Sequence, residues 1–175
     1  EGGCFSWRVM NASGTVVVGA VGLAALGWRM HPWTQDDLVE LVVLCVMGIL
    51  SESVRESDVG GKTGLSFTSI VSLSSVALVG PFGAAVVGAV PHLLGVNKDR
   101  AQVRIFNSAM NSAHGAVAAF VYLLIGGPKV VDPAFGAQDL LLRVGVPLMV
   151  AYVALCLSTA LTQSCLLRAS AGHPS

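Results

Sequence analysis

Long stretches without a charged residue most strongly limit what this chain can fold into. No Asp, Glu, Lys or Arg occurs from Val9 to Trp28 or from Thr63 to Asn97. At about 1.5 Å per residue, a helix over 9–28 matches the roughly 30 Å hydrocarbon core of a bilayer. The chain is 54% hydrophobic and only 11% charged, whereas soluble domains average about 25% charged residues. These features predict an integral membrane protein built from helices.

The longer charge-free stretch is divided by Gly80-Pro81. Proline lacks an N–H group and disfavours the helical conformation in the residue before it, so we predict two spans joined by a tight turn. With the other apolar runs, the pattern predicts one all-α domain over residues 1–175, a polytopic integral membrane bundle of about six transmembrane helices. Pro147 would lie in the first turn of the last span, where its missing N–H costs least. The predicted spans are 9–28, 37–54, 66–79, 82–96, 105–126 and 144–163.

The basic residues are distributed unevenly about these spans. If the N-terminus is inside, Arg29, Lys129 and Arg143 lie outside and the other seven of the ten Lys and Arg lie on the cytoplasmic side. Cytoplasmic loops carry the excess of positive charge in membrane proteins. We therefore predict a multi-pass protein of the cell membrane with both termini in the cytoplasm. Ten acidic residues balance the ten basic ones, so no basic field favours a nucleic-acid partner.

A polar stripe marks the fifth predicted span. Asn107, Asn111 and His114 are spaced i, i+4 and i+7, so they share one face of a helix. Polar groups in hydrocarbon are expensive and normally face the bundle interior, a partner or a cavity. One interpretation is the wall of a ligand-binding pocket or a proton-sensitive site, because histidine changes charge near neutral pH. The other is interhelical hydrogen bonding that only fixes the packing.

Small residues recur every fourth position on the fourth predicted span, at Gly80, Ala84 and Gly88. Such a face allows close helix packing, either within the chain or in a homo-oligomer.

Charged residues gather at the cytoplasmic end of the second predicted span. Glu52, Arg55 and Glu56 occupy one helical turn there. They could form an ion pair with Arg104, or be a solvated helix end of little energetic weight.

The sequence contains no recognisable catalytic or metal-binding constellation. Its four cysteines, Cys4, Cys45, Cys156 and Cys165, form no C-x-x-C pair or Cys/His cluster. An enzyme would need a nucleophile with a base, a metal cluster or paired carboxylates. We therefore predict a protein that is not an enzyme and that uses no metal or cofactor.

One part of the chain resembles known membrane regions. A Ser-rich span, the Gly80-Pro81 turn and a Gly/Ala-rich span run from Gly64 to Val90, followed by a basic loop and Arg104-Ile-Phe106-Asn107-Ser-Ala-Met-Asn111. This pattern, covering about 38–122, resembles the N-terminal membrane region of bacterial, especially actinobacterial, signalling proteins. In those proteins it precedes a cyclic-dinucleotide cyclase or phosphodiesterase, or an HD-type phosphohydrolase. The arrangement is also similar to the substrate-binding subunit of energy-coupling-factor vitamin transporters.

The resemblance implies a membrane-embedded sensory or ligand-binding domain of a bacterial signalling protein, with a small apolar ligand and a cytoplasmic output domain. The alternative is the substrate-binding component of a transporter for a small, vitamin-like molecule, working with an ATP-driven partner. Only Arg168 to Ser175 follow Leu167, so the sensory interpretation predicts an output domain on a longer chain or on a separate protein. Phe106 and Asn107 have no catalytic role in the resemblance.

Overall fold

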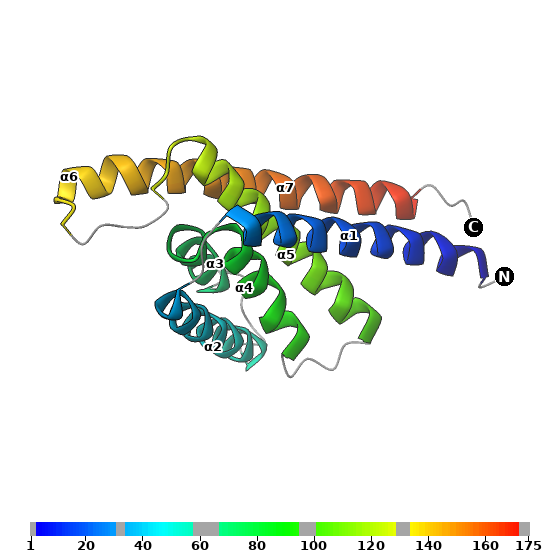
Figure 1. The fold of residues 1–175 in the computed structure, drawn as a ribbon. Coiled ribbons are helices and arrows are strands. Elements are labelled where there is room, and N and C mark those ends of the chain that lie inside the picture. The colour runs from blue at the N-terminus through cyan, green and yellow to red at the C-terminus, as the bar shows by residue number, and fades with distance from the viewer. Residues whose placement is uncertain (1–2, 31–33, 58–66, 95–100, 129–133, 172–175) are drawn as a thin grey trace.

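The protein is described by a computed structural model over residues 3–30, 34–57, 67–94, 101–128 and 134–171. Within these ranges the chain is helical and contains no strand, which confirms the predicted all-α fold. Five helices are α1 (Gly3–Met30), α2 (Gln35–Ser57), α3 (Phe67–Leu78), α4 (Gly80–Leu94) and α5 (Ala101–Leu124). The sixth helical segment runs without a break through α6 (Ala137–Asp139), a π-helical turn (Leu140–Gly145) and α7 (Val146–Ala171), as Figure 1 shows.

The length and apolar character of each helix bear on how many of the helices can cross a membrane. Among the described residues, one segment, Ala137–Cys165, is long and apolar enough to cross a membrane. Two apolar helical stretches are shorter: Val16–Arg29, which lies within α1, and Gly80–Leu94, which is α4. The described ranges therefore form six helical segments, but their length and composition do not confirm a bundle of six spans.

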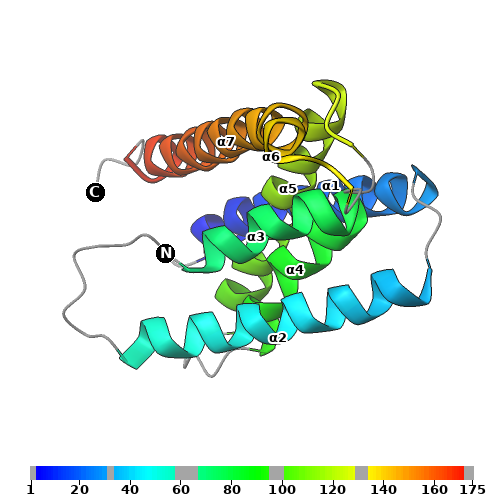
Figure 2. The same ribbon diagram turned by 90° about the vertical axis from the view of Figure 1, so that its left-hand side faces the viewer.

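The short helix α4 lies at the centre of the molecule. It packs against α1, α2, α3 and α5, and Figures 1 and 2 both place α2 and α7 on opposite sides of the middle layer that contains it. Most of its buried residues are small: Pro81, Gly83, Ala84, Ala85, Val87, Gly88 and Pro91. Small side chains let neighbouring helices approach α4 closely from several sides.

The connection from α3 to α4 is very short. Only Val79 separates Leu78, the last residue of α3, from Gly80, the first residue of α4. Gly80 has a φ of +66°, a conformation that glycine adopts without the steric penalty paid by other residues. Pro81 follows in the first helical turn, where a missing N–H leaves no bond unmade. The chain can therefore reverse direction within two residues.

The last helical segment begins earlier than predicted. The prediction was a span over 144–163 with Pro147 in its first turn, but the segment starts at Ala137, so Pro147 lies inside it. Proline cannot donate to the carbonyl four residues before it. The π-helical turn ends at Gly145, two residues before Pro147, and the N–H of Val146 bonds to the carbonyl of Leu141. Such local adjustments let an apolar helix continue through a proline.

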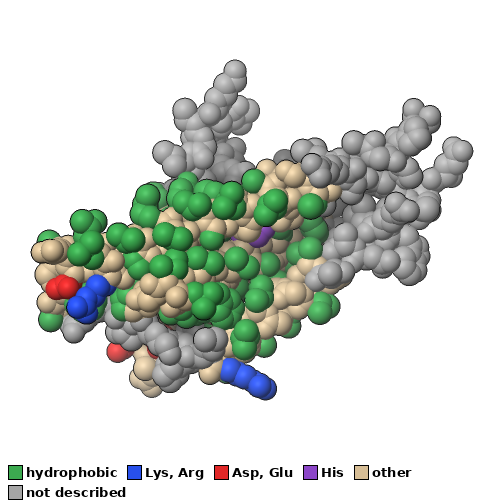
Figure 3. All heavy atoms as spheres, turned by 90° about the horizontal axis from the view of Figure 1, so that it is seen from above, with side chains coloured by type: hydrophobic (Ala, Val, Ile, Leu, Met, Phe, Trp, Pro, Cys, Tyr) green, Lys and Arg blue, Asp and Glu red, His purple; other side chains and the backbone are tan. Residues whose placement is uncertain are grey.

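Large apolar side chains cover much of the exterior. Figure 3 shows them across the middle of one face, with the charged side chains near its left end and lower edge. Leu124 is 84% exposed, Val18 73%, and Met149 and Leu161 66% each. The buried positions, by contrast, are occupied mainly by alanine, glycine, serine and valine. The sizes of interior and exterior side chains are thus opposite to those of a typical soluble protein.

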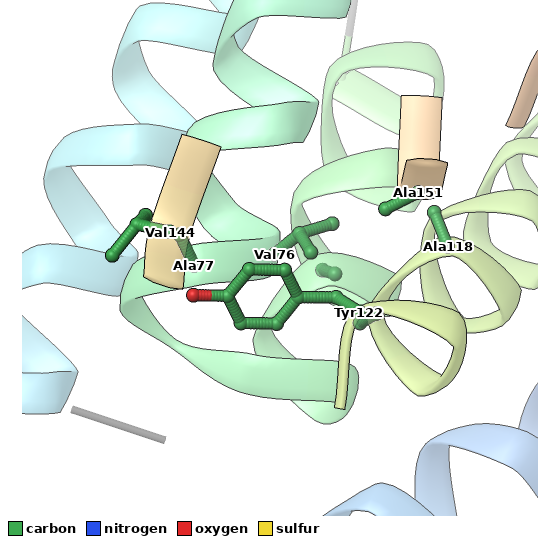
Figure 4. Packing of buried hydrophobic residues seen from close by; sticks show 8 residues of the cluster. Val76, Ala77, Ala118, Tyr122, Val144 and Ala151 are labelled. Carbon is green, nitrogen blue, oxygen red and sulfur yellow. The ribbon is translucent and has the colours of Figure 1, made fainter. Parts of the chain in front are cut away.

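Two small apolar clusters hold the helices together. The first joins α3, α4, α5 and the last helical segment around the ring of Tyr122, as Figure 4 shows. Its buried members are Val76, Ala77, Ala84, Ala118, Ala119, Tyr122, Val144 and Ala151. The second cluster joins α2, α3 and α4 through Leu44, Val71, Val79 and Val87. Both clusters include α3 and α4, so this pair of helices connects the two sides of the molecule.

Candidate functional site

The three polar residues of the predicted stripe lie on α5, but they do not form one contact. His114 is buried, at 7% exposure, whereas Asn107 and Asn111 are half-buried. The side-chain Nδ2 of Asn111 donates to the backbone carbonyl of Asn107 at 2.8 Å. This bond lies within α5. Of the three residues in the stripe, His114 is the one whose side chain has a described hydrogen bond to another helix.

His114 lies between two threonines of α7. Its Nε2 is 3.1 Å from the Oγ1 of Thr162, and its Nδ1 is 3.3 Å from the Oγ1 of Thr159. We call these three residues the polar seam. Residues three apart on a helix share a face, so α7 presents both hydroxyls to the same imidazole ring. Among the described residues, the side-chain hydrogen bonds between α5 and α7 are those of the polar seam.

Each threonine hydroxyl is also close to a carbonyl of its own helix. The Oγ1 of Thr159 is 2.9 Å from the carbonyl oxygen of Leu155, and that of Thr162 is 2.8 Å from the carbonyl oxygen of Ser158. Bonding to the carbonyl four residues earlier is the usual behaviour of threonine inside a helix. A hydroxyl that donates its proton there still offers oxygen lone pairs to the histidine.

Sequence reasoning missed Thr159 and Thr162. A signal was available, because two hydroxyl residues three apart in the predicted span 144–163 define a polar stripe of their own. What the sequence did not supply was the partner of that stripe. His114 is separated from Thr159 by 45 residues and from Thr162 by 48.

On another side, α5 touches α4 backbone to backbone. A Cβ atom added to Gly88 would lie 2.6 Å from the carbonyl oxygen of Asn111, and one added to Gly115 would lie 2.6 Å from the carbonyl oxygen of Ala84. Glycine at both positions is therefore needed for this approach. Two of the predicted packing residues, Ala84 and Gly88, lie in this contact and are buried by it. Because α5 already covers them, a second copy of the chain cannot use the same contact.

Gly80, the third predicted packing residue, has a different place. It lies at the turn before Pro81, and a Cβ atom there would meet nothing within 4 Å. Its contribution is its positive φ, not close approach to another helix.

The start of α5 is tied to the end of α4. The guanidinium of Arg104 donates a hydrogen bond to the backbone carbonyl of Leu93. The side chains of Glu52, Arg55 and Glu56, considered above as ion-pair partners of Arg104, lie outside the described part of the structure. The described role of Arg104 is thus to hold two helix ends together.

Two buried hydroxyls of α5 have no hydrogen-bond partner among the described residues: the Oγ of Ser108 and the phenolic oxygen of Tyr122. Tyr122 is 1% exposed. Its ring is covered by the turn that follows α5, where a Cβ atom on Gly127 would come within 2.5 Å of the ring carbons. Figure 4 shows the hydroxyl of Tyr122 directed toward Ala77 and Val144.

Metal-binding groups are sparse. Within the described residues, no three His, Cys, Asp or Glu side chains lie together in a way that could hold a metal ion. The cysteines described, Cys45, Cys156 and Cys165, are free thiols.

Comparisons of the chain with protein-family models, with curated proteins and with solved structures found no match.

Proposed function

We propose that this chain is a membrane-embedded sensory or ligand-binding domain of a bacterial signalling protein, with six helical segments crossing the bilayer and both termini in the cytoplasm. The observation that supports the membrane location is the distribution of side-chain size, small inside and large and apolar outside. In water, exposed apolar surface costs about 25 cal/mol per Å² relative to burial. In lipid this cost disappears, and small residues at helix contacts are the usual way to gain packing energy.

The positions of the charged residues agree with this proposal. The described ones lie near helix ends: Arg29, Asp36, Asp37, Glu40, Arg104, Asp139 and Arg143. At the start of the last segment, Arg143 and Asp139 form an exposed ion pair of 3.2 Å. From there to Cys165 the segment carries no charge. Over its most apolar 18 residues, only 11% of the residues are buried. A core helix of a soluble protein would be mostly buried.

The position of the short helices α3 and α4 also agrees with a shared apolar layer that contains α1. The ring of Phe82, next to the α3–α4 turn, contacts the ring of Trp28 edge to face, with centroids 4.9 Å apart. Trp28 lies two residues before the end of α1, and tryptophan favours the membrane–water interface. The turn therefore reaches the level at which α1 ends, which supports placing one end of the pair at the edge of the same apolar layer.

A signal would act through the polar seam. Hydrogen-bonding side chains inside the apolar layer are costly unless they have partners, and here His114 meets its partners only on α7. A ligand or proton that changes these bonds would shift α7 relative to α5. Because α7 leads toward the predicted cytoplasmic C-terminus, such a shift could be passed to an output domain. The resemblance of the region 38–122 to bacterial sensor regions supports this function.

Accessibility of single cysteines tests the membrane location. In a chain with Cys4, Cys45, Cys156 and Cys165 replaced by serine, one cysteine is placed in each of the four longer interhelical connections and treated with a membrane-impermeant maleimide in intact cells. We expect labelling in the connections 31–33 and 129–133 and protection in 58–66 and 95–100. Equal labelling of all four, or recovery of the chain in the soluble fraction, would contradict the proposal.

Native mass spectrometry of the purified chain from its own host tests ligand binding. A small molecule that co-purifies with the wild type should be lost in Asn107→Leu and His114→Leu. Gln163→Leu is the matched control, because Gln163 is an exposed polar residue beside Thr162 on α7. If the wild type carries nothing and the variants only lose stability, the stripe on α5 is packing and the ligand-binding role is wrong.

A transport component is the second candidate. A Cβ atom added to Gly14, Gly19 or Gly22 of α1 would meet nothing within 4 Å, so this helix offers a small-residue surface on which a partner's helix could pack. The reading frame beyond Ser175 distinguishes the two functions. A soluble signalling domain there favours the sensor, whereas a stop codon and a neighbouring ATPase gene favour the transporter.

A further inference from the structure

The polar seam gives His114 hydrogen-bonding partners at both ring nitrogens. A neutral imidazole has one N–H donor and one acceptor nitrogen, whereas the imidazolium has two donors. A threonine hydroxyl has one proton to donate and lone pairs that accept. The protonation states that the seam can hold therefore depend on where each threonine directs its single proton.

Thr162 and Thr159 each have this choice of partner. The hydroxyl of Thr162 lies 2.8 Å from the Ser158 carbonyl and 3.1 Å from Nε2; when it donates to the carbonyl, it accepts from the Nε2–H of the ring. The hydroxyl of Thr159 lies 2.9 Å from the Leu155 carbonyl and 3.3 Å from Nδ1. Its proton can serve only one of the two. Directed at Nδ1, it satisfies a neutral ring; directed at the carbonyl, it accepts from the Nδ1–H of a cationic ring.

We propose that His114 is a reversible proton-binding site in the polar seam, held in both protonation states by Thr159 and Thr162. The two states differ in whether a threonine hydroxyl directs its proton at the ring or at the carbonyl of its own helix. This inference deepens the proposed sensory function, on which its biological purpose rests, by naming the proton as the bound species. The geometry of the site itself does not depend on that purpose.

No described charged side chain competes for the proton. Within the part of the chain that the structure describes, His114 has two hydrogen-bond partners, Thr159 and Thr162, and α3 contains no titratable residue from Phe67 to Leu78. The described titratable or charged side chains elsewhere on α5 and on the other helices packed against it are Arg29, His92, Arg104, Tyr122, Tyr152, Cys156 and Cys165. None of these is bonded to His114. The cost of placing a charge in this buried site is thus opposed by two charge-assisted hydrogen bonds and not by a counter-ion.

The test is NMR of the full chain labelled with ¹⁵N-histidine in lipid nanodiscs, titrated from pH 5 to pH 8. Loss of one signal in His114→Asn assigns the ring. We expect a folded protein in which His114 changes reversibly between a neutral Nε2–H form and a cation. In Thr159→Val the midpoint should fall by about one pH unit, because hydrogen bonds to charged groups are roughly twice as strong as neutral ones. Ser164→Ala, on the exposed side of α7, should leave the midpoint unchanged.

Two results would overturn the proposal. One is a ring that keeps a single protonation state throughout while the other histidines titrate. The other is an equal midpoint in wild type and Thr159→Val with both proteins folded, because the threonine would then not hold the cation. Cysteine labelling separates this failure from that of the proposed function. A non-titrating His114 in a chain that crosses the membrane refutes the proton site alone, and a titrating one in a chain that does not cross refutes the membrane location alone.

Discussion

Replacing Gly88 by alanine should force α4 and α5 apart. The added Cβ would lie 2.6 Å from the carbonyl oxygen of Asn111, 2.9 Å from its carbonyl carbon and 3.1 Å from the amide nitrogen of Ser112. All three are backbone atoms of α5, so no flexible side chain can move aside. Ordinary van der Waals contact begins at 3.4 Å, which leaves the helices short of the required separation by about 0.8 Å. Overpacking of this kind costs about 1–3 kcal/mol.

A smaller effect works in the opposite direction. Alanine is favoured over glycine inside a helix by about 0.5–1 kcal/mol. The net loss expected for Gly88→Ala is therefore about 1–2 kcal/mol of unfolding free energy. Gly22→Ala is the matched control, because Gly22 lies inside α1 with nothing within 4 Å of the new Cβ. It keeps the gain in helix propensity without the clash, so its stability should be unchanged or slightly higher.

The assay is equilibrium unfolding of the purified chain in mixed detergent micelles. Gly115→Ala is a second test of the same contact. Its Cβ, on α5, would lie against the backbone carbonyl of Ala84 on α4. Once α4 and α5 have separated for one substitution, the second costs less, so the double variant should lose less than the sum of the two singles. If Gly88→Ala is as stable as Gly22→Ala, or if the two losses are strictly additive, α4 and α5 do not touch as described.

Two further substitutions test single features of the fold in the same assay. Tyr122→Phe removes a buried hydroxyl that has no partner among the described residues, so stability should stay equal or rise by about 1 kcal/mol; a clear loss would reveal a partner for this hydroxyl. Gly80→Ala places a Cβ on a backbone with φ +66° and should cost about 1–2 kcal/mol, whereas Gly136→Ala, at φ −66° with open space around it, should cost little.

The helices could be predicted because apolar length and proline chemistry act locally. The division of the long charge-free stretch follows from Gly80-Pro81, and α3 and α4 lie on its two sides. The last helical segment extends beyond the predicted span 144–163 at its N-terminal end, to Ala137, and includes Asp139 and Arg143. In the structure these two residues are i,i+4 neighbours that form an ion pair on a helix surface. Charge density alone does not distinguish an exposed helix end from a connection.

The sequence predicts the residues that α5 contributes to the candidate site, but not those that α7 contributes. Periodicity places Asn107, Asn111 and His114 on one face of α5, yet it cannot say which helix lies opposite that face. In the structure, two different helices lie against α5: the backbone of Asn111 faces α4 at Gly88, and the ring of His114 faces α7. Contacts over such sequence separations depend on how the helices assemble, which local patterns do not encode.

These two contacts of α5 differ in how readily they can change. At α4 the backbones meet through Gly88 and Gly115 with no side chain between them, so any sliding of the two helices produces a clash with main-chain atoms. At α7 the contact at His114 consists of hydrogen bonds between side chains, whose donors and acceptors can exchange by rotation of a hydroxyl. A signal that alters the polar seam should therefore leave α4 and α5 together as one unit. Under the proposed function, the helix that responds is α7, whose opposite face is exposed and apolar.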